Sequence, residues 1–306
     1  VLVSLENMLA PREGFRVGTS VAELKEAVKN LHCEEVGICL DTGHANYNGL
    51  EVAEEVREAA RFIESAGSWR MEIGAGTNPE RAGTIIECAR AAAEASHLRV
   101  WVNSGPSFSR ADLEQLREVG VEEVGASLET INPAVFRRVK PGDSLEKRMR
   151  LAKEIIAAGL KLMSVMMVGL GSTTSDYVKH LFWLKELGVD HLPITGLNPI
   201  PGTPLANESP ASPLEVCRMV AVARLVLRTP DISTGGMMND PRLLPLQIMA
   251  GANRAIHLGA HVHRKRPAGS FRMWPVVEQK EVHGLVFSNL RPVSERIIEE
   301  MGLVAG

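Results

Sequence analysis

Three residues near the start of the chain are of types that bind divalent metal ions. Glu6 lies at the end of a strand-like run at residues 1–7, and Asp41 and His44 follow a second apolar run at residues 35–40. Carboxylates and imidazoles bind zinc or manganese, and the carboxyl ends of neighbouring parallel strands meet at one edge of a sheet. The same residue types cap helices in the loops that follow strands. The spacing therefore leaves two interpretations open, a Zn or Mn site and a set of helix caps.

The segment 162–206 predicts a ligand pocket at such an edge. Two apolar runs of strand length flank a segment whose apolar side chains recur at about 3.6-residue spacing, which is typical of a helix. Strand, turn, helix and strand form a unit whose two strands are parallel. Glycines just past a strand let backbone N–H groups approach a ligand closely, although ordinary turns use the same residues. The residues that end the two runs are the candidates for this pocket: Gly169, Gly171, Asn198 and Pro199.

The same alternation of strand and helix continues along most of the chain. Expected strands lie at residues 1–7, 35–40, 69–74, 98–102, 121–128, 162–168, 192–197, 232–236 and 246–256. Expected helices lie at residues 21–31, 50–65, 80–95, 111–119, 145–158, 177–187, 214–227 and 293–301. This pattern predicts an α/β protein with a parallel sheet, a TIM-type (βα)8 barrel with a short C-terminal extension. Because the strands outnumber the positions of such a barrel by one, we expect the barrel to be hybrid or incomplete.

Composition and charge limit the classes of function. The chain has 306 residues, 45% of them hydrophobic and 23% charged, which is typical of a soluble globular protein. A net charge of −3 argues against general binding of nucleic acid, which needs a basic surface. No apolar run reaches the roughly 18 residues that span a membrane, and four cysteines are too few for a disulfide framework. We expect a cytoplasmic protein with a small-molecule ligand and, because the chain begins with Val1, a cut N-terminus.

Two motifs of the segment 162–206 resemble a known family. VGLG and NPIPGTPLA, at this separation, resemble the fifth and sixth strands of the biotin-synthase-like radical S-adenosylmethionine enzymes, whose relatives include maturases of hydrogenase cofactors. The resemblance covers residues 59–258 and includes MAGAN near its end, which is similar to the signature of the family's eighth strand. It implies S-adenosylmethionine as the cofactor. It also implies further binding positions at Glu72, Gly74, Gly76, Ser127, Glu129 and Arg148.

The resemblance gives each of these positions a role. The backbone from Glu72 to Gly76 would lie against the methionine end of the cofactor, and Ser127 and Glu129 would form the polar pair of the fourth strand. Arg148 would hold the carboxylate of S-adenosylmethionine. A guanidinium suits that role because it pairs with a carboxylate through two parallel hydrogen bonds. The other charged residues around Arg148 leave a second interpretation open, in which they all form one solvated helix face.

The sequence does not supply the ligands of the family's iron–sulfur cluster. A [4Fe–4S] cluster of this kind needs thiolates in a Cys-x3-Cys-x2-Cys loop, whereas the four cysteines stand at positions 33, 39, 88 and 217. Ser172 stands where the resemblance places a glutamate, and residues 232–236 lack the family's arginine. We therefore predict S-adenosylmethionine binding at most, without a cluster, and we assign no catalytic residue.

The first part of the chain resembles a different family. LENM and GICLDTGHAN are similar to the middle of the xylose-isomerase-like barrels, which include sugar-phosphate isomerases and endonuclease IV. This resemblance implies Glu6, Asp41 and His44 as metal ligands. We expect the strand in GICLDTG to take the vacant first position of the barrel. The chain would then be a hybrid of three parts: residues 1–58, 59–258 and 259–306.

Three functions remain open at this point. The chain is a radical S-adenosylmethionine-type barrel limited to cofactor binding, or a divalent-metal-dependent isomerase or endonuclease. The endonuclease is the one alternative in which nucleic acid would bind. The third alternative is a fused reading frame, a chimera without activity. Near the boundary of the C-terminal extension, His257, His261 and His263 predict a solvated basic loop rather than a metal site, because no carboxylate or cysteine lies near them in the sequence.

Overall fold

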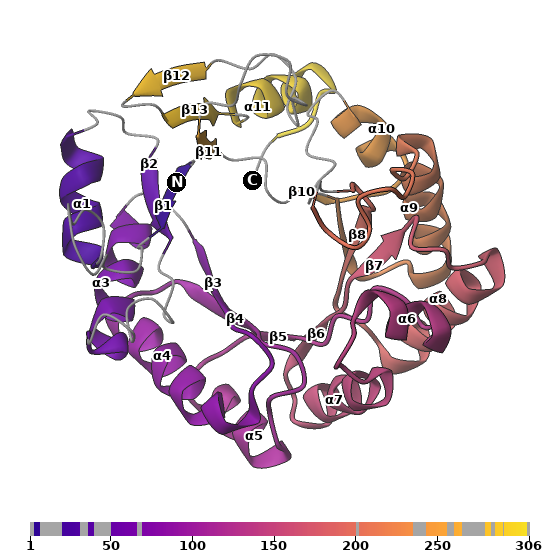
Figure 1. The fold of residues 1–306 in the computed structure, drawn as a ribbon, viewed down its shortest axis with the longest axis horizontal. Helices are drawn as coiled ribbons and strands as arrows, with labels where there is room; N and C mark the ends of the chain where they lie inside the picture. Colours follow the sequence, from indigo (N-terminus) through magenta and orange to yellow (C-terminus); the bar gives the residue numbers. More distant parts are fainter. Residues whose placement is uncertain are drawn as a thin grey trace.

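The computed structural model describes residues 3–6, 20–30, 36–39, 50–65, 69–199, 202–234, 243–255, 260–264, 279–282, 285–289 and 291–304. Its centre is a parallel sheet with the strand order β10-β9-β8-β6-β5-β4-β3, in which β7 also pairs with β8 (Figure 1). The strands are β3 (Arg70–Gly74), β4 (Arg99–Asn103), β5 (Glu123–Gly125), β6 (Lys161–Met163), β7 (Met166–Val168), β8 (His191–Gly196), β9 (Asp231–Thr234) and β10 (Arg254–Ala255). Among the described residues this sheet does not close on itself. The predicted α/β class with parallel strands is confirmed.

The strand predicted at residues 162–168 is interrupted. β6 pairs with β5 and β8, and β7 continues along β8 after a break at Ser164. The buried Ser164 donates its N–H to the carbonyl of His191 (3.0 Å) and its hydroxyl to the carbonyl of Ala126 (3.0 Å). A hydroxyl that bonds the neighbouring backbone competes with the regular ladder of a sheet, which accounts for the break.

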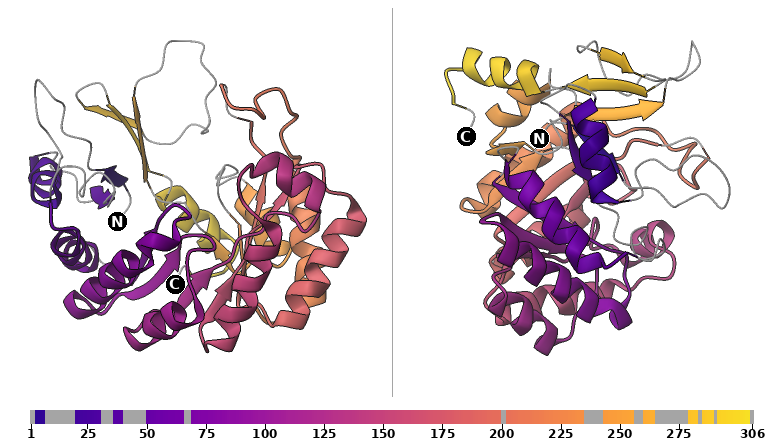
Figure 2. Two further views of the ribbon diagram at one scale, coloured as in Figure 1. Left: turned by 60° about the horizontal axis from the view of Figure 1, so that its bottom comes forward. Right: turned by 90° about the vertical axis from the view of Figure 1, so that its left-hand side faces the viewer.

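Helices cover the outer face of the sheet in every view (Figures 1 and 2). Two of them begin with capping boxes, Ser109 with Asp112 and Thr173 with Asp176, which satisfy backbone N–H groups of the first turn. The helices around the sheet are α3 (Val52–Ser65), the short η1 (Pro79–Arg81), α4 (Ala82–Ala95), α5 (Arg110–Glu118), α6 (Pro133–Val139), α7 (Leu145–Ala157), α8 (Thr174–Leu187) and α9 (Pro213–Leu227).

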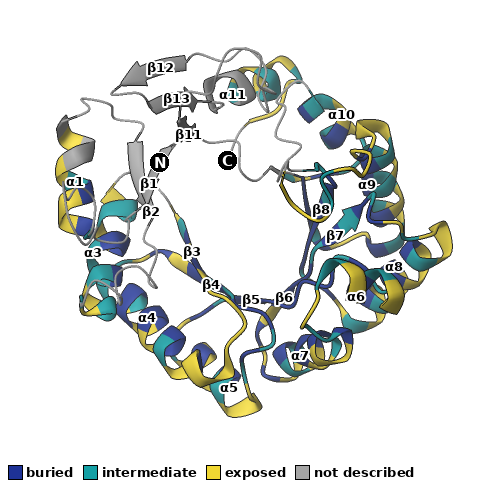
Figure 3. Cartoon of the chain, viewed as in Figure 1, coloured by how far each residue is buried: buried dark blue, intermediate teal, exposed yellow. Residues whose placement is uncertain are grey.

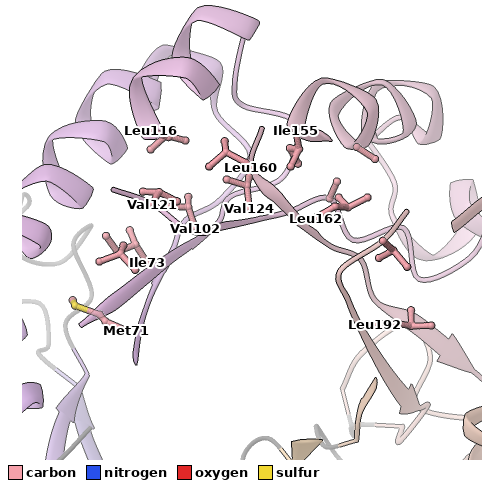
Figure 4. Packing of buried hydrophobic residues seen from close by; sticks show 14 of the residues in the cluster. Met71, Ile73, Val102, Leu116, Val121, Val124, Ile155, Leu160, Leu162 and Leu192 are labelled. Atoms are coloured by element: carbon pink, nitrogen blue, oxygen red, sulfur yellow. The ribbon is translucent and has the colours of Figure 1, made fainter. Parts of the chain in front are cut away.

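The hydrophobic core lies between the sheet and these helices. Val102, Val124 and Leu162 are fully buried and face Leu116 of α5 and Ile155 of α7 (Figure 4). In Figure 3 the buried sides of the helices are the ones turned toward the strands. Such strands, apolar on the face that helices cover, are typical of parallel sheets.

Two smaller sheets complete the ring. β1 (Val3–Glu6) and β2 (Val36–Cys39) pair in parallel, followed in space by the antiparallel β11 (Ala260–Arg264), β13 (Leu285–Asn289) and β12 (Gln279–Val282). In Figure 1 they lie in the part of the ring between β3 and β10. β2, the strand of GICLDTG, pairs with β1 and with no strand of the central sheet among the described residues. Helix α1 (Val21–Asn30) packs on β2 and α3.

Three predictions for the C-terminal part of the chain have different outcomes. Helix α10 (Leu244–Met249) and the short β10 (Arg254–Ala255) lie where a single strand was predicted at residues 246–256, so that prediction is wrong. A short apolar run does not distinguish a strand from a buried helix. The basic loop predicted around His261 and His263 is strand β11, and His257 lies outside the described residues. Helix α11 (Arg291–Glu300) confirms the expected C-terminal helix and packs on α10.

The boundary predicted at residue 58 falls inside a continuous helix. α3 runs from Val52 to Ser65 and buries Val56, Ala59 and Ala60, which lie on both sides of that boundary. The same helix packs on α4, which covers the central sheet. The division into three parts stays a prediction.

Candidate functional site

The predicted binding residues lie at the carboxyl edge of the central sheet. Glu72 and Gly74 belong to β3, and Gly76 lies in the loop that follows it. Ser127 and Glu129 follow β5, and Arg148 lies in α7. Gly169 and Gly171 follow β7, and Asn198 and Pro199 follow β8. Parallel strands bring all these loops to one edge, which is where α/β proteins bind ligands.

Arg148 points inward from the second turn of α7 and is 8% exposed. Its Nε and Nη2 lie 2.7 Å and 2.6 Å from the same oxygen of Asp143, and its Nη1 donates to the carbonyl of Ser127 (2.7 Å). The exposed helix face contains its neighbours instead, among them Glu146 and Lys147. The interpretation of Arg148 as part of a solvated face is therefore wrong, and a buried guanidinium lies at the carboxyl edge.

Gly105 lets the loops after β3 and β4 meet beside this guanidinium. Its φ is +62°, and a Cβ there would lie 2.3 Å from Oγ1 of Thr77 and 3.2 Å from Nη2 of Arg148. Ser107 joins the same loops, because its hydroxyl accepts the N–H of Asn78 (3.0 Å). Gly105 was not predicted as a site residue, although the Gly-Pro pair that it begins, separated from β4 by one residue, is a known signal of a turn.

Glu129 holds a left-handed backbone that is uncommon for a residue other than glycine, with a φ of 58°. Two backbone hydrogen bonds hold this conformation. The N–H of Glu129 donates to the carbonyl of Val165 (3.0 Å), and its carbonyl accepts the N–H of Met167 (3.0 Å). Burial raises the pKa of the Glu129 carboxyl, and the ammonium of Lys140, 2.7 Å from Oε2, opposes that rise. Outliers of this kind gather at functional sites, which supports the predicted role of Glu129.

A second carboxylate of this region, Asp143, was missed by sequence reasoning. Burial acts to raise its pKa, but hydrogen bonds from Arg148 and from the N–H of Ser144 outweigh burial and lower the pKa of Asp143 below its ordinary value. Asp143 is therefore ionised at neutral pH. The turn Lys140-Pro141-Gly142-Asp143 reads as generic turn chemistry in the sequence, so its charges gave no signal.

Glu72 lies at the inner side of β3, beside Asn103 of β4. The surrounding protein raises the pKa of the Glu72 carboxyl, although its side chain retains contact with solvent. A hydrogen bond from Nδ2 of Asn103 (3.3 Å) partly offsets that rise. Glu72 and Glu129 are thus two carboxyl groups at the same edge whose pKa values are raised by burial, as in many binding sites.

The glycine turn after β7 is built for packing. Gly169 has a φ of +94°, a Cβ on it would lie 3.1 Å from Ala211, and its N–H donates to the hydroxyl of Tyr177 (3.3 Å). That N–H is therefore occupied. Beyond the turn, the hydroxyl of Ser172 lies 2.7 Å from that of Thr130, next to Glu129. Here the structure favours ordinary turn chemistry over the ligand role predicted for Gly169.

The metal site predicted from Glu6, Asp41 and His44 falls largely on residues without description. Glu6 ends β1, but its side chain lies outside the described part of the structure, as do Asp41 and His44 altogether. Within the described residues no group of three His, Cys, Asp or Glu side chains could hold a metal ion. This metal site stays a prediction.

Cys88 and Cys217, the two cysteines whose side chains the structure describes, do not fit an iron–sulfur cluster. Cys88 is buried in α4, and burial raises the pKa of its thiol to about 11, away from the thiolate that iron needs. Cys217 lies in α9, which is also outside the sheet, and burial raises its pKa as well. Cys39 ends β2, and Cys33 is outside the described residues.

A cavity of about 310 Å³ lies at the opposite, amino edge of the sheet. Its charged residues pair with one another, for example Arg254 with Asp231 (2.5 Å) and Lys161 with Glu122 (2.5 Å). None of the predicted binding residues lines it. In barrels of this type the amino edge serves stability, which the paired charges fit.

The comparisons with known proteins decide the family. A model described as Radical SAM superfamily matches residues 19–184, and one described as the Biotin and Thiamin Synthesis associated domain matches residues 193–271. The chain belongs to the radical SAM superfamily. The first match begins inside the segment attributed above to xylose-isomerase-like barrels. A fusion with that second family is not among the findings.

Curated relatives agree with this assignment. An uncharacterized protein of Methanocaldococcus jannaschii is 31% identical over 201 residues, 65% of this chain and 53% of that protein, so the match spans about half the length of this relative. The biotin synthase of Carboxydothermus hydrogenoformans is 30% identical over 239 residues, 74% of this chain and 73% of that enzyme. The predicted likeness to biotin-synthase-like proteins is confirmed.

Solved structures with low sequence identity show the same fold. Methylornithine synthase aligns with a TM-score of 0.64 at 19% identity, over 83% of this chain and 73% of that one. A maturase of the [FeFe]-hydrogenase aligns with a TM-score of 0.59 at 18% identity, over 70% of this chain and 52% of that one.

Among the helices that the structure describes, none combines the length and the apolar character that a membrane span requires.

Proposed function

We propose that this chain binds S-adenosylmethionine at the carboxyl edge of its sheet, with Arg148 as the partner of the ligand's carboxylate. The observation behind this proposal is the buried guanidinium that α7 points into the site. A charge buried at a ligand-binding edge is costly unless it meets an opposite charge, which Asp143 supplies in this structure and a ligand carboxylate would supply in its place. Membership of the radical SAM superfamily supports the same ligand.

The donors of Arg148 fit the carboxylate of a ligand. Asp143 accepts from Nε and Nη2 in this structure, and the carbonyl of Ser127 accepts from Nη1. Nε and Nη2 are a pair of N–H groups that can bind a carboxylate in a bidentate manner, so a ligand carboxylate can take the place of Asp143.

The remaining polar residues suit the rest of the ligand. Glu72 and Glu129 lie at the same edge and offer carboxyl oxygens to an ammonium or to sugar hydroxyls. The backbone at Gly74 and Gly76 has no side chain, and nothing lies within 4 Å of a Cβ placed on Gly76. A ligand can therefore approach this backbone closely.

The proposed function is limited to binding. In this superfamily a [4Fe–4S] cluster supplies the electron that splits S-adenosylmethionine, and the described thiols of this chain do not fit such a cluster. The residues at the carboxyl edge bind and orient the ligand, and no radical step is assigned to them. Biotin synthase chemistry remains a property of the relatives.

Calorimetric titration with two ligands tests this function. S-adenosylmethionine and its decarboxylated analogue differ only in the carboxylate that Arg148 is proposed to hold. The protein should bind the first at least tenfold more tightly, because a charge-assisted bidentate contact contributes about 1.5–3 kcal/mol. Equal affinities, or no binding of S-adenosylmethionine, would refute the proposal.

A further inference from the structure

The turn between α6 and α7 delivers two opposite charges to the candidate site. The ammonium of Lys140 lies 2.7 Å from Oε2 of Glu129, and a carboxylate oxygen of Asp143 lies 2.6 Å from Nη2 of Arg148. The side chains of the four residues are between 9% and 22% exposed. Two ion pairs, largely shielded from water, therefore occupy the residues proposed to bind the ligand.

This turn holds both charges in fixed positions. Lys140 directly follows α6 and donates its N–H to the carbonyl of Phe136 (2.8 Å), and Asp143 donates its N–H to the carbonyl of Lys140 (3.2 Å). The second oxygen of Asp143 accepts the N–H of Ser144 (2.7 Å), the cap of α7. Phe136 packs with Leu128 and Leu145 in a small buried cluster beneath the turn. Side chains held in this way lose little further conformational freedom when they form ion pairs.

The two ion pairs act on one another. The charge of Arg148 lowers the pKa of the Glu129 carboxyl, and the charge of Asp143 raises it. Lys140 in turn favours the ionised form of Asp143. The protein side of the site thus presents an anion, Glu129, and a cation, Arg148. The turn complements them with a cation, Lys140, and an anion, Asp143.

An α-amino acid bears the same two complementary charges, an ammonium and a carboxylate. We propose that Lys140 and Asp143 stand in for the amino-acid end of the ligand and compete with it for Glu129 and Arg148, so that they determine the specificity of the site. This inference rests on the proposed function. A ligand without an ammonium cannot replace Lys140, and one without a carboxylate cannot replace Asp143. A ligand with both charges replaces both residues and leaves neither Glu129 nor Arg148 without a partner.

Removal of one competing charge should therefore strengthen binding. Asp143→Asn keeps the shape of the side chain but leaves the buried Arg148 without its anion, which favours any carboxylate that enters the site. Lys140→Met leaves Glu129 without its cation, which favours any ammonium that enters the site. We expect each variant to bind S-adenosylmethionine at least threefold more tightly than the unchanged chain. Affinity for 5′-methylthioadenosine, which has no amino-acid end, should stay within twofold.

The experiment is a calorimetric titration of the full chain and these variants with both ligands. Glu154→Gln serves as the matched control, since Glu154 also lies in α7 and pairs with Arg110 (3.6 Å) while 42% exposed. Weaker or unchanged binding of S-adenosylmethionine by Asp143→Asn would overturn the inference and make Asp143 a residue that only orients Arg148. Lys140→Met provides an independent arm if Asp143→Asn does not fold. A chain that binds S-adenosylmethionine in no variant would instead refute the proposed function itself.

Discussion

Nδ1 of His191 lies 3.1 Å from Oε1 of Glu123, at the amino edge of the sheet, opposite the candidate site. Nε2 of the same ring lies 2.8 Å from the hydroxyl of Ser233, and Nη2 of Arg70 lies 2.8 Å from the same oxygen of Glu123. This buried network joins β3, β5, β8 and β9. The amino edge thus serves stability, and it lies apart from the carboxyl edge at which binding is proposed.

Loss of Glu123 should therefore lower stability without changing ligand affinity. Glu123→Ala removes the anion that Arg70 and His191 share, and a buried charge without its partner costs about 3–5 kcal/mol. Urea unfolding measures the change. Glu122→Gln is the control, because Glu122 is 30% exposed and its pairs should contribute about 1 kcal/mol or less. Equal losses in the two variants would contradict this account of the network.

His180 should make the protein sensitive to acid. It is 1% exposed in α8, neither ring nitrogen has a hydrogen-bond partner, and burial lowers its pKa from 6.5 to about 4. Between these two values the unfolded chain takes up a proton that the folded chain does not, so stability falls as the pH falls. The loss should approach roughly 3 kcal/mol.

His180→Leu should remove that sensitivity. It should also raise the free energy of unfolding at pH 7 by about 1–3 kcal/mol, because an unsatisfied buried polar group disappears. Thermal unfolding of both proteins between pH 4 and pH 7 measures the two effects. A variant whose stability follows the same pH curve as the unchanged chain would contradict the assignment.

Two glycines with positive φ separate backbone strain from close contact. Gly120→Ala should cost about 1–2 kcal/mol, because its φ is +92° but nothing lies within 4 Å of the added Cβ. Gly105→Ala adds a collision with Thr77 to similar strain and should cost about 1–3 kcal/mol more. It should also weaken S-adenosylmethionine binding, since the added Cβ approaches Arg148. Chemical unfolding and calorimetry test the pair, and equal behaviour of both variants would refute the close contact.

Cys88 should resist alkylation in the folded protein. Its thiol is 3% exposed with a pKa near 11, so only about one thiol in a thousand is ionised at pH 8. Mass spectrometry after treatment with iodoacetamide should find Cys88 unmodified until the chain is unfolded. Rapid modification under native conditions would show that the thiol is accessible and reopen the question of a metal-binding role.

The sequence pattern predicted the repeating part of this structure well, and the single contacts poorly. The alternation of strands and helices, and the place of Arg148 at the carboxyl edge, followed from periodicity and from resemblance. The break of the strand at Ser164 did not, because it depends on two hydrogen bonds to the backbone of His191 and Ala126, which are distant in the sequence. The ion pairs of Lys140 and Asp143 were missed for the same reason. Their partners are set by how a turn folds back, which spacing along the chain does not reveal.

Substitution of Arg148 combined with the decarboxylated ligand tests the central claim most directly. Arg148→Ala should weaken the binding of S-adenosylmethionine at least tenfold and leave the binding of decarboxylated S-adenosylmethionine unchanged, so that the two ligands become equivalent. Arg150→Ala, exposed on the same helix, should leave the preference for S-adenosylmethionine intact. A folded Arg148→Ala protein that still prefers S-adenosylmethionine over its decarboxylated analogue would contradict the assignment of this site.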